Sequence, residues 1–214
     1  MPLPSGPCYS CAFGTARMEH IVRQYGLEEG AIEVQYIEEN FREFRNKKAA
    51  DEIISRLVDR EFLILLSMAR LSETDGELIP VGFKVGHELR EHESQAPLVD
   101  LVGQLAGCVD FSDRKIFYSW IGGTRREWRG QGHYRALTEQ QEEWAHDHGY
   151  HELVVKTKNR FYPMRATLDH LNFDVIKLQP DLEDNRESKL YLSKRIGAQL
   201  LKGHQTVRTL RDTV

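Results

Sequence analysis

Apolar and polar residues follow two different periods along this chain, and each change of period marks a new element. Apolar side chains alternate with their neighbours over residues 32–37, which predicts a first strand there, preceded by a short helix within residues 15–28. From Phe41 to Val58 the apolar positions recur every three or four residues among many charges. This spacing predicts one or two amphipathic helices.

Strand and helix patterns alternate in the rest of the chain. A β-hairpin is predicted at residues 62–88, where two apolar runs flank the turn Asp75-Gly76. A long helix is expected after Gly132, and Gly149 stands where a C-cap glycine belongs. One further helix is expected at residues 161–171, and further strands at residues 115–121, 153–155, 173–178 and 189–196. This order predicts a mixed α/β (α+β) fold and fits neither a doubly wound repeat nor a barrel.

The pattern divides the chain into three parts. Residues 1–29 are expected to form a leader with a short helix, residues 30–196 the folded domain, and residues 197–214 a polar, basic tail. An insertion at residues 90–113 combines a charged loop with apolar residues at helical spacing. An apolar helical face needs a partner, so we expect it to cover a cleft, to form a homodimer interface, or to pack onto its own domain.

Composition narrows the partners and the compartment. The 214 residues hold 29 Lys and Arg against 33 Asp and Glu, a formal net charge of -4, whereas nucleic-acid binders usually carry a basic excess. The longest apolar run, Phe62–Leu66, has the length of a buried strand and not of a membrane span. Three cysteines form an odd, sparse set that favours a reducing compartment. We therefore expect a soluble cytoplasmic protein that binds neither nucleic acid nor membrane.

Two groups of residues resemble parts of metal sites. Cys8 and Cys11 form a C-x-x-C pair, but no second pair follows at zinc spacing. A leader with two thiols is therefore favoured over half a metal site or a redox pair. His146, His148 and His151 are divided between a helix end and the next strand. We expect no metal site.

Residues 125–134, Arg-Arg-Glu-Trp-Arg-Gly-Gln-Gly-His-Tyr, carry the candidate chemistry. They form a glycine-rich turn between a strand and a helix, and such a turn presents unpaired backbone N–H groups and the positive end of the helix dipole. Gly130 and Gly132 let the backbone approach an anion closely, and Arg129 adds a fixed charge. The turn is therefore a candidate pyrophosphate site. It lacks the Lys-Ser/Thr of a Walker loop and the full glycine pattern of a dinucleotide fingerprint.

The same turn resembles the coenzyme-A loop of the GNAT superfamily of N-acetyltransferases, whose pattern is Arg/Gln-x-x-Gly-x-Gly/Ala. Arg129 and Gly132 match this pattern, and Tyr134 departs from it. The resemblance covers residues 115–178, where Asn172 replaces the glycine of the family's Gly-Phe pair. Asn tolerates a left-handed conformation almost as well as glycine. The resemblance implies a central mixed, mostly antiparallel twisted sheet flanked by helices, and acetyl-coenzyme A as cosubstrate.

By this resemblance, the strand that ends near Thr124 separates from its neighbour and binds the pantetheine arm through backbone groups of Gly122 and Thr124. A backbone N–H there could also stabilise the oxyanion that forms on the thioester. Asn159 matches a family position that contacts the coenzyme arm, and its alternative role is to cap the helix at residues 161–171. The remaining coenzyme contacts are expected from Arg129, Gly130, Gln131, Gly132, His133 and Tyr134.

Acetyl transfer to an amine is helped by a base for the amine and an acid for the departing thiolate. The resemblance implies a tyrosine acid five residues before Phe173, but Leu168 stands there and cannot donate a proton. Tyr162 is the candidate acid, with a packing role as the alternative. Glu33 and Glu38, which border the expected first strand, are candidates for the base or for an amine anchor; the alternative is an ordinary solvated carboxylate.

The acceptor side is expected on the central strand, where Tyr118 and Trp120 share one face and are candidate substrate-binding residues. The resemblance thus implies an N-acetyltransferase that acts by direct attack of a primary amine, on a small molecule or a peptide. One alternative is a catalytically weak GNAT-fold protein that binds acyl-coenzyme A as a sensor or scaffold, which the missing tyrosine favours. A third is an unrelated nucleotide-binding α/β protein.

Overall fold

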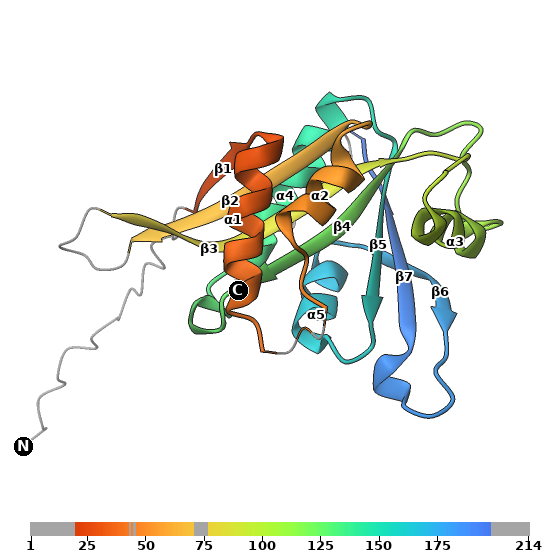
Figure 1. Ribbon diagram of the computed structural model, residues 1–214. Helices are drawn as coiled ribbons and strands as arrows, with labels where there is room; N and C mark the ends of the chain where they lie inside the picture. Colours follow the sequence, from red (N-terminus) through yellow and green to blue (C-terminus); the bar gives the residue numbers. More distant parts are fainter. Residues whose placement is uncertain (1–19, 43, 45, 71–76, 198–214) are drawn as a thin grey trace, which may run out of the picture.

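One seven-stranded sheet organises the computed structural model, which describes residues 20–42, 44, 46–70 and 77–197. The strands lie in the order β1-β2-β3-β4-β5-β7-β6, and every neighbouring pair is antiparallel except the parallel pair β4–β5 (Figure 1). The predicted mixed α/β fold with a mostly antiparallel sheet is confirmed. The strands are β1 (Ile21–Tyr25), β2 (Phe62–Arg70), β3 (Leu78–Leu89), β4 (Ile116–Thr124), β5 (Glu152–Lys158), β6 (Asp174–Gln179) and β7 (Lys189–Arg195).

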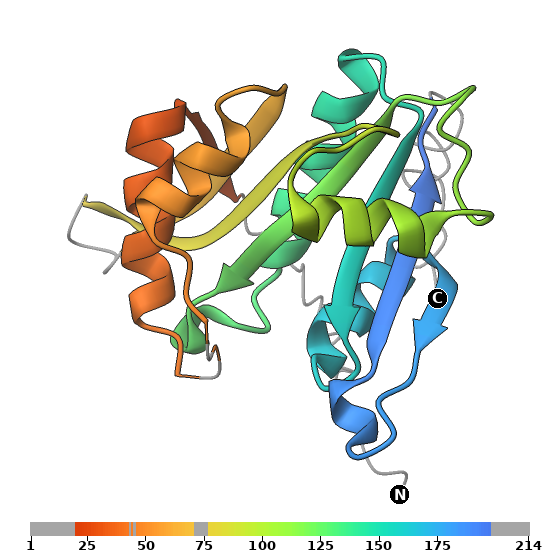
Figure 2. The ribbon, with the colours of Figure 1, turned by 45° about the vertical axis from the view of Figure 1, so that its right-hand side comes forward.

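Helices cover both faces of the sheet (Figure 2). They are α1 (Leu27–Glu39), α2 (Ala50–Leu57), α3 (Ala96–Leu105), α4 (His133–Asp147) and α5 (Tyr162–His170), with short 3-10 turns at Arg126–Trp128 and Asn185–Glu187. α4 and α5 pack on one face, where Leu137 and Leu168 join Leu63 and Leu65 of β2 in one core. α1 and α2 pack on the other face, against the β2 residues that alternate with these.

The first two elements differ from the prediction. Residues 32–37 belong to helix α1, and the strand β1 precedes it where a helix was expected. Ala31, Val34 and Ile37 are fully buried, at the three-residue spacing of a helix face, whereas Ile32 and Tyr36 are 61% and 53% exposed. The apparent alternation therefore came from residues on opposite sides of a helix. β1 pairs only with β2 at the sheet edge, so its own pattern is weak.

The predicted pairing of β2 with β3 and the predicted left-handed residues after two helices are confirmed where the structure describes them. β2 and β3 form the expected antiparallel pair, although their turn, like Cys8 and Cys11, lies outside the described residues. Gly149 follows α4 with φ of 75°, and Asn172 follows α5 with φ of 61°. Both residues thus take the left-handed conformation that ends a helix.

The insertion at residues 90–113 packs onto its own domain. It contains α3, whose Leu98, Leu101 and Leu105 are buried against β4, β5 and β7. Before α3, the guanidinium of Arg60 donates to both carboxylate oxygens of Glu93, at 2.9 and 3.1 Å. Packing onto the domain is shown, and α3 also adds a wall beside β4, where Leu98 and Leu101 border a cleft. The homodimer interface stays a prediction.

Candidate active site

The sheet opens between its two parallel strands. β4 and β5 pair only from Ile116–Ser119 to Glu152–Val155. Beyond these pairs β4 continues to Thr124 beside β3, and β5 continues to Lys158 beside β7, without pairing with each other (Figure 2). Beyond Ser119 and Val155, each strand therefore has an edge of backbone N–H and C=O groups that faces the gap between the two strands, which we call the wedge. Such an edge can bind an extended, amide-containing chain as a missing strand would.

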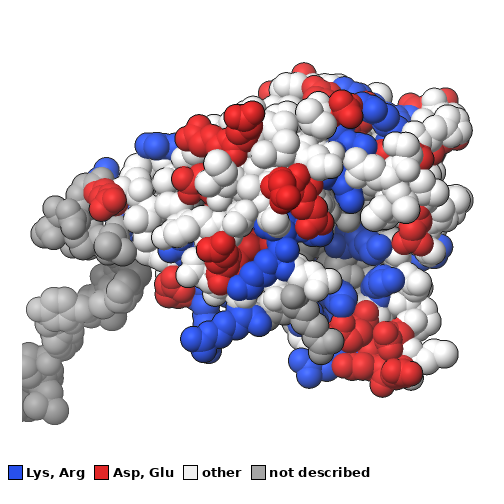
Figure 3. All heavy atoms as spheres, in the orientation of Figure 1, with Lys and Arg blue, Asp and Glu red and all other residues white. Residues whose placement is uncertain are grey.

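A cleft of about 1770 Å³ opens at this wedge. Its walls come from β4, the 125–132 loop and α4, from the α1–α2 connection and α3, and from β5 and α5. Lys and Arg side chains gather in the hollow between the two halves of the molecule (Figure 3). Glu38 and Glu52 are the only acidic side chains of the described lining, and its cations are Lys48, Arg56, Arg126, Arg129, Arg135, Lys156, Lys158, Arg160, Arg186 and Lys189.

This excess of cations contrasts with the net charge of -4 for the whole chain. Positive groups concentrated in a concave site favour a multiply charged anion over a cation. A pyrophosphate-bearing ligand fits this distribution.

A β-bulge changes the direction of β4 at the point where the wedge begins. Val85 of β3 pairs with Ile121, but the next residue, Gly86, pairs with Ser119, so Trp120 is an extra residue on β4. Bulges of this kind bend a strand and end its regular pairing. Here the bulge coincides with the point at which β4 leaves β5.

The loop after β4 has the geometry of an anion site. Gly130 and Gly132 have φ of 78° and 90°, and Gly132 is the N-cap of α4. A glycine at the N-cap offers no side-chain acceptor, so the first backbone N–H groups of α4 remain available to a ligand. Gly132 lines the cleft. The N-terminus of a fifteen-residue helix therefore points its positive dipole end into the cation-rich hollow.

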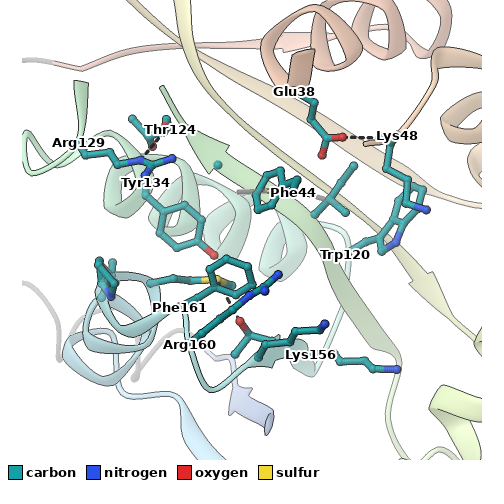
Figure 4. A pocket seen from close by; sticks show the side chains of 18 of the residues that line it. Glu38, Phe44, Lys48, Trp120, Thr124, Arg129, Tyr134, Lys156, Arg160 and Phe161 are labelled. Atoms are coloured by element: carbon teal, nitrogen blue, oxygen red, sulfur yellow. Dashed lines mark hydrogen bonds between the residues drawn. The ribbon is translucent and has the colours of Figure 1, made fainter. Parts of the chain in front are cut away.

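Arg129 stabilises the conformation of this loop through a hydrogen bond and also gives the loop a positive charge. Its Nε donates to the carbonyl oxygen of Thr124 at 2.9 Å (Figure 4). Its guanidinium lies 5.6 Å from the ring centre of Phe41. The side chain thus ties the loop to the last residue of β4. Arg135 donates to Glu139 one turn along α4.

Seven of the predicted coenzyme residues line the cleft: Gly122, Thr124, Arg129, Gly130, Gly132, His133 and Tyr134. The side chains of His133 and Gln131, however, are engaged elsewhere. The imidazole Nδ1 of His133 lies 2.8 Å from Oγ of Ser67 on β2, so that ring faces the interior. The side-chain amide of Gln131 donates to the carbonyl of Glu127 at 3.3 Å. For the loop residues the backbone is therefore the expected contact.

Asn159 does not cap the helix that follows it. α5 begins at Tyr162, and its N-cap residue Phe161 makes no side-chain cap bond. The amide of Asn159 instead donates to the carbonyl of Asn185 at 3.0 Å, and its side-chain oxygen accepts from Arg165. The capping alternative is wrong, and the side chain lies beside the cleft, outside its lining.

The two candidate carboxylates have different surroundings. Glu38 lies at the end of α1, is 3% exposed and lines the cleft, where its Oε2 accepts from the backbone N–H of Lys48 at 2.5 Å (Figure 4). Burial raises the pKa of Glu38 above its ordinary value, and the bond from Lys48 acts against this rise. Glu33 lies outside the lining. A carboxylate with a raised pKa inside a cleft is a candidate base.

The candidate acid Tyr162 is poorly placed. Its side chain is 56% exposed and is absent from the cleft lining, although Phe161 and Pro163 beside it are present. Leu168, at the position where the resemblance implied a tyrosine, is fully buried in the core. Neither residue offers a proton to the wedge.

The predicted acceptor residues do line the cleft. Tyr118 is buried under α3, and Trp120 is half-buried. The cations of Arg56 and Lys48 lie 4.8 and 5.8 Å from the ring centre of Trp120. Sequence reasoning did not foresee these two cations, because Arg56 comes from α2 and Lys48 from the connection before it. Leu98 of α3 also lines the cleft, which fits one of the alternatives expected for the insertion.

A buried lysine is a further residue that sequence reasoning missed. Lys84 of β3 is 1% exposed and donates to the hydroxyl of Tyr134 at 3.1 Å and to Thr138 at 2.9 Å. Burial lowers the pKa of Lys84 to about 7. The only signal in the sequence was one lysine in an apolar strand.

No helix in the described part of the chain is both long and apolar enough to cross a membrane. Over the same residues, no group of three or more His, Cys, Asp or Glu side chains is placed to hold a metal ion.

Comparisons with known proteins identify the fold. No family model and no curated protein sequence matches the chain. Among solved structures it is similar to Arabidopsis thaliana NAA60 bound to a bisubstrate analogue, with a TM-score of 0.62 and 10% identity over 84% of this chain and 99% of that one. A chain of the NatC complex bound to a Gag peptide and CoA gives a TM-score of 0.60 and 13% identity, over 84% and 100%.

A protein from Desulfovibrio desulfuricans described as a GNAT-family acetyltransferase gives a TM-score of 0.57 at 12% identity, over 84% of this chain and 100% of that one. At these identities the likeness shows the fold and not the activity.

Proposed function

Since this chain has the GNAT acetyltransferase fold, we propose that it is an N-acetyltransferase, which moves the acetyl group of acetyl-coenzyme A to a primary amine of a small molecule or peptide. The observation that carries this proposal is the wedge between β4 and β5, which opens beside the left-handed glycine loop at the N-terminus of α4. One side of the site suits an extended amide chain and the other suits a pyrophosphate.

The residues of the wedge match the parts of the coenzyme. The backbone at Gly130 and Gly132 would hold the pyrophosphate, since neither residue has a side chain of its own, and the neighbour nearest to Gly132 is the flexible end of His20. Backbone groups of Gly122 and Thr124 would pair with the amides of the pantetheine arm. Acetyl-coenzyme A itself supplies an activated thioester, so the protein's task is to place an amine against it and to manage protons.

Glu38 is the proposed base. An amine must be neutral to attack, and a buried carboxylate whose pKa is raised toward neutrality can accept its proton efficiently. Glu38 reaches the cleft from the α1–α2 side, across from the coenzyme loop (Figure 4). Backbone N–H groups of β4 at the bulge would stabilise the oxyanion that forms on the thioester carbonyl.

The structural neighbours support a peptide amine as one acceptor. The NatC complex was solved with a peptide and CoA, and the NAA60 structure holds a bisubstrate analogue. The cleft here, lined by α3 and by the connection between α1 and α2, is large enough for an acceptor beside the coenzyme.

One observation favours a second function. Leu168 is a core residue at the position where the resemblance implied the acid, which fits a protein that binds acyl-coenzyme A as a sensor with little turnover. The two functions share the coenzyme site and differ in turnover.

Two measurements on the full chain test the proposal. Calorimetry should show binding of coenzyme A and much weaker binding of ATP. Thiol release from acetyl-coenzyme A should depend on an added amine, in a panel of amino acids, polyamines and peptides with free N-termini. Coenzyme-A binding without thiol release for any amine would favour the sensor, and equal binding of ATP would overturn both functions.

A further inference from the structure

Tyr134 occupies the position of the coenzyme loop at which the chain departs from the family pattern. It lies in the first turn of α4, lines the cleft, and packs against the part of β4 that borders the wedge. A Cβ atom at Gly122 would lie 3.3 Å from Cε2 of Tyr134 and 3.5 Å from Cγ of Lys84. The glycine therefore leaves room for the ring and the lysine stem to meet under the strand.

The buried side chain of Lys84 donates a hydrogen bond to the hydroxyl of Tyr134. Its Nζ is 3.1 Å from that oxygen, 2.9 Å from Oγ1 of Thr138, and 4.3 Å from the centre of the Tyr134 ring. An ammonium can only donate, so the phenol oxygen accepts from it. The phenol proton is then the group that Tyr134 can offer to another acceptor in the cleft.

We propose that Tyr134 is the proton donor to the thiolate that leaves during acetyl transfer, and that Lys84 is the positioning residue that orients its hydroxyl and replaces its proton. This proposal rests on the proposed acetyltransferase function. It assigns the acid role to an α4 residue, in place of the position held by the buried Leu168.

The amine nitrogen bonds to the acetyl carbon and gives its proton to Glu38, and the carbon–sulfur bond breaks with its electron pair on sulfur. That sulfur takes the proton of the Tyr134 hydroxyl, and the phenolate takes one from the Nζ of Lys84. The products are the acetylated amine and coenzyme A with a free thiol. Glu38 is left protonated and Lys84 neutral, and the loss of one proton from Glu38 and the gain of one by Lys84 restore both groups before the next cycle.

The surroundings of Lys84 suit this exchange. Burial lowers its pKa to about 7, and the nearby charge of Glu142 on α4 acts in the opposite direction. Glu142 is itself buried and paired with Lys194 of β7. A group that titrates near neutral pH can both give and regain a proton during turnover. Burial also raises the pKa of Tyr134, which keeps the hydroxyl protonated until the lysine compensates its charge.

Other tyrosines of the described cleft region are less suitable. Tyr118 packs under α3, where its ring meets that of His87 at 5.5 Å. Tyr162 is 56% exposed and outside the lining. Of these tyrosines, only Tyr134 combines a place in the cleft with an oxygen held by a buried cation.

The decisive experiment titrates the thiol of coenzyme A bound to the full chain, by the ultraviolet absorbance of its thiolate. A donor at the sulfur stabilises the thiolate, so Tyr134→Phe should raise the pKa of the bound thiol by about 1–2, the equivalent of one charge-assisted hydrogen bond. Tyr36→Phe, an exposed tyrosine on α1 outside the lining, is the matched control and should leave it unchanged.

With an amine found in the thiol-release screen, Tyr134→Phe should lower kcat about 100-fold while KM for acetyl-coenzyme A changes little. Lys84→Met keeps the stem without the charge, and should lower kcat and remove the loss of activity that the wild type shows as pH rises above about 7. An unchanged thiol pKa in Tyr134→Phe, or a kcat loss that follows Tyr162→Phe instead, would overturn the proposal. Failure of the wild type to bind coenzyme A would overturn the proposed function with it.

Discussion

Replacing Gly132 by alanine separates the proposed coenzyme role of the loop from the effect of its backbone geometry on stability. Gly132 has φ of 90° at the N-terminus of α4, and Gly149 has φ of 75° at the other end of the same helix. An L-residue in this region costs about 1–2 kcal/mol. Gly132→Ala and Gly149→Ala should therefore lose similar stability, with Tm falling by about 2–8 °C for a chain of this size.

Only the first variant should lose coenzyme affinity. A methyl group at Gly132 stands where the backbone N–H groups of α4 are expected to meet the pyrophosphate, and each charge-assisted hydrogen bond contributes about 1.5–3 kcal/mol. Affinity for coenzyme A should thus fall about 10–150-fold. The methyl would also lie 2.9 Å from Nε2 of His20, the far end of a flexible side chain that can turn aside. At Gly149 no atom of the described residues lies within 4 Å of the added methyl.

Thermal unfolding by circular dichroism and calorimetry with coenzyme A, run on both variants, give the two quantities. Equal affinity losses in Gly132→Ala and Gly149→Ala would refute the assignment of the loop to the pyrophosphate, because both variants carry the same backbone strain. An unchanged affinity in a folded Gly132→Ala would refute it as well.

Three further changes test other parts of the site. Glu38→Gln should lower kcat about 100-fold or more and remove the activity loss that the wild type shows as pH falls through the raised pKa of Glu38, measured as a pH–rate profile. Arg129→Ala should weaken coenzyme-A binding by about 1–3 kcal/mol, and equal weakening for pantetheine alone would show that the bond to Thr124 matters and not a phosphate contact. Lys194→Met should cost about 3–5 kcal/mol in denaturant unfolding because Glu142 stays buried without its partner, and the double variant Lys194→Met with Glu142→Leu should recover most of the loss.

The geometry of the glycine loop before α4 could be predicted from the sequence because it depends on local residues. Two glycines before a helix need no distant contact to take left-handed backbone angles, and the same holds for Asn172 after α5. The order of elements also follows from local periods. The first strand was placed wrongly because α1 carries apolar residues on its outer side, Ile32 and Tyr36, and burial in the fold decided between the two periods.

The side chains proposed as catalytic depend on contacts that no local pattern shows. Lys84 and Tyr134 are fifty residues apart in the chain and meet because β3 and α4 cross beneath Gly122. Glu38 was expected beside a strand, and it reaches the cleft because α1 ends at the wedge. These positions follow from the packing of whole elements, which a single sequence does not specify.

The short pairing between β4 and β5 also has a mechanical consequence. The sheet consists of two parts, strands β1–β4 and strands β5–β7. They pair with each other only along residues Ile116–Ser119 of β4, a stretch called the seam here, and α4 packs across both parts. Any change in the angle between the two parts is concentrated at that seam. Phe117 and Leu153 pair there within the core, so we expect their packing to influence the width of the opening. Substitutions at such positions would alter what the protein binds without touching the ligand.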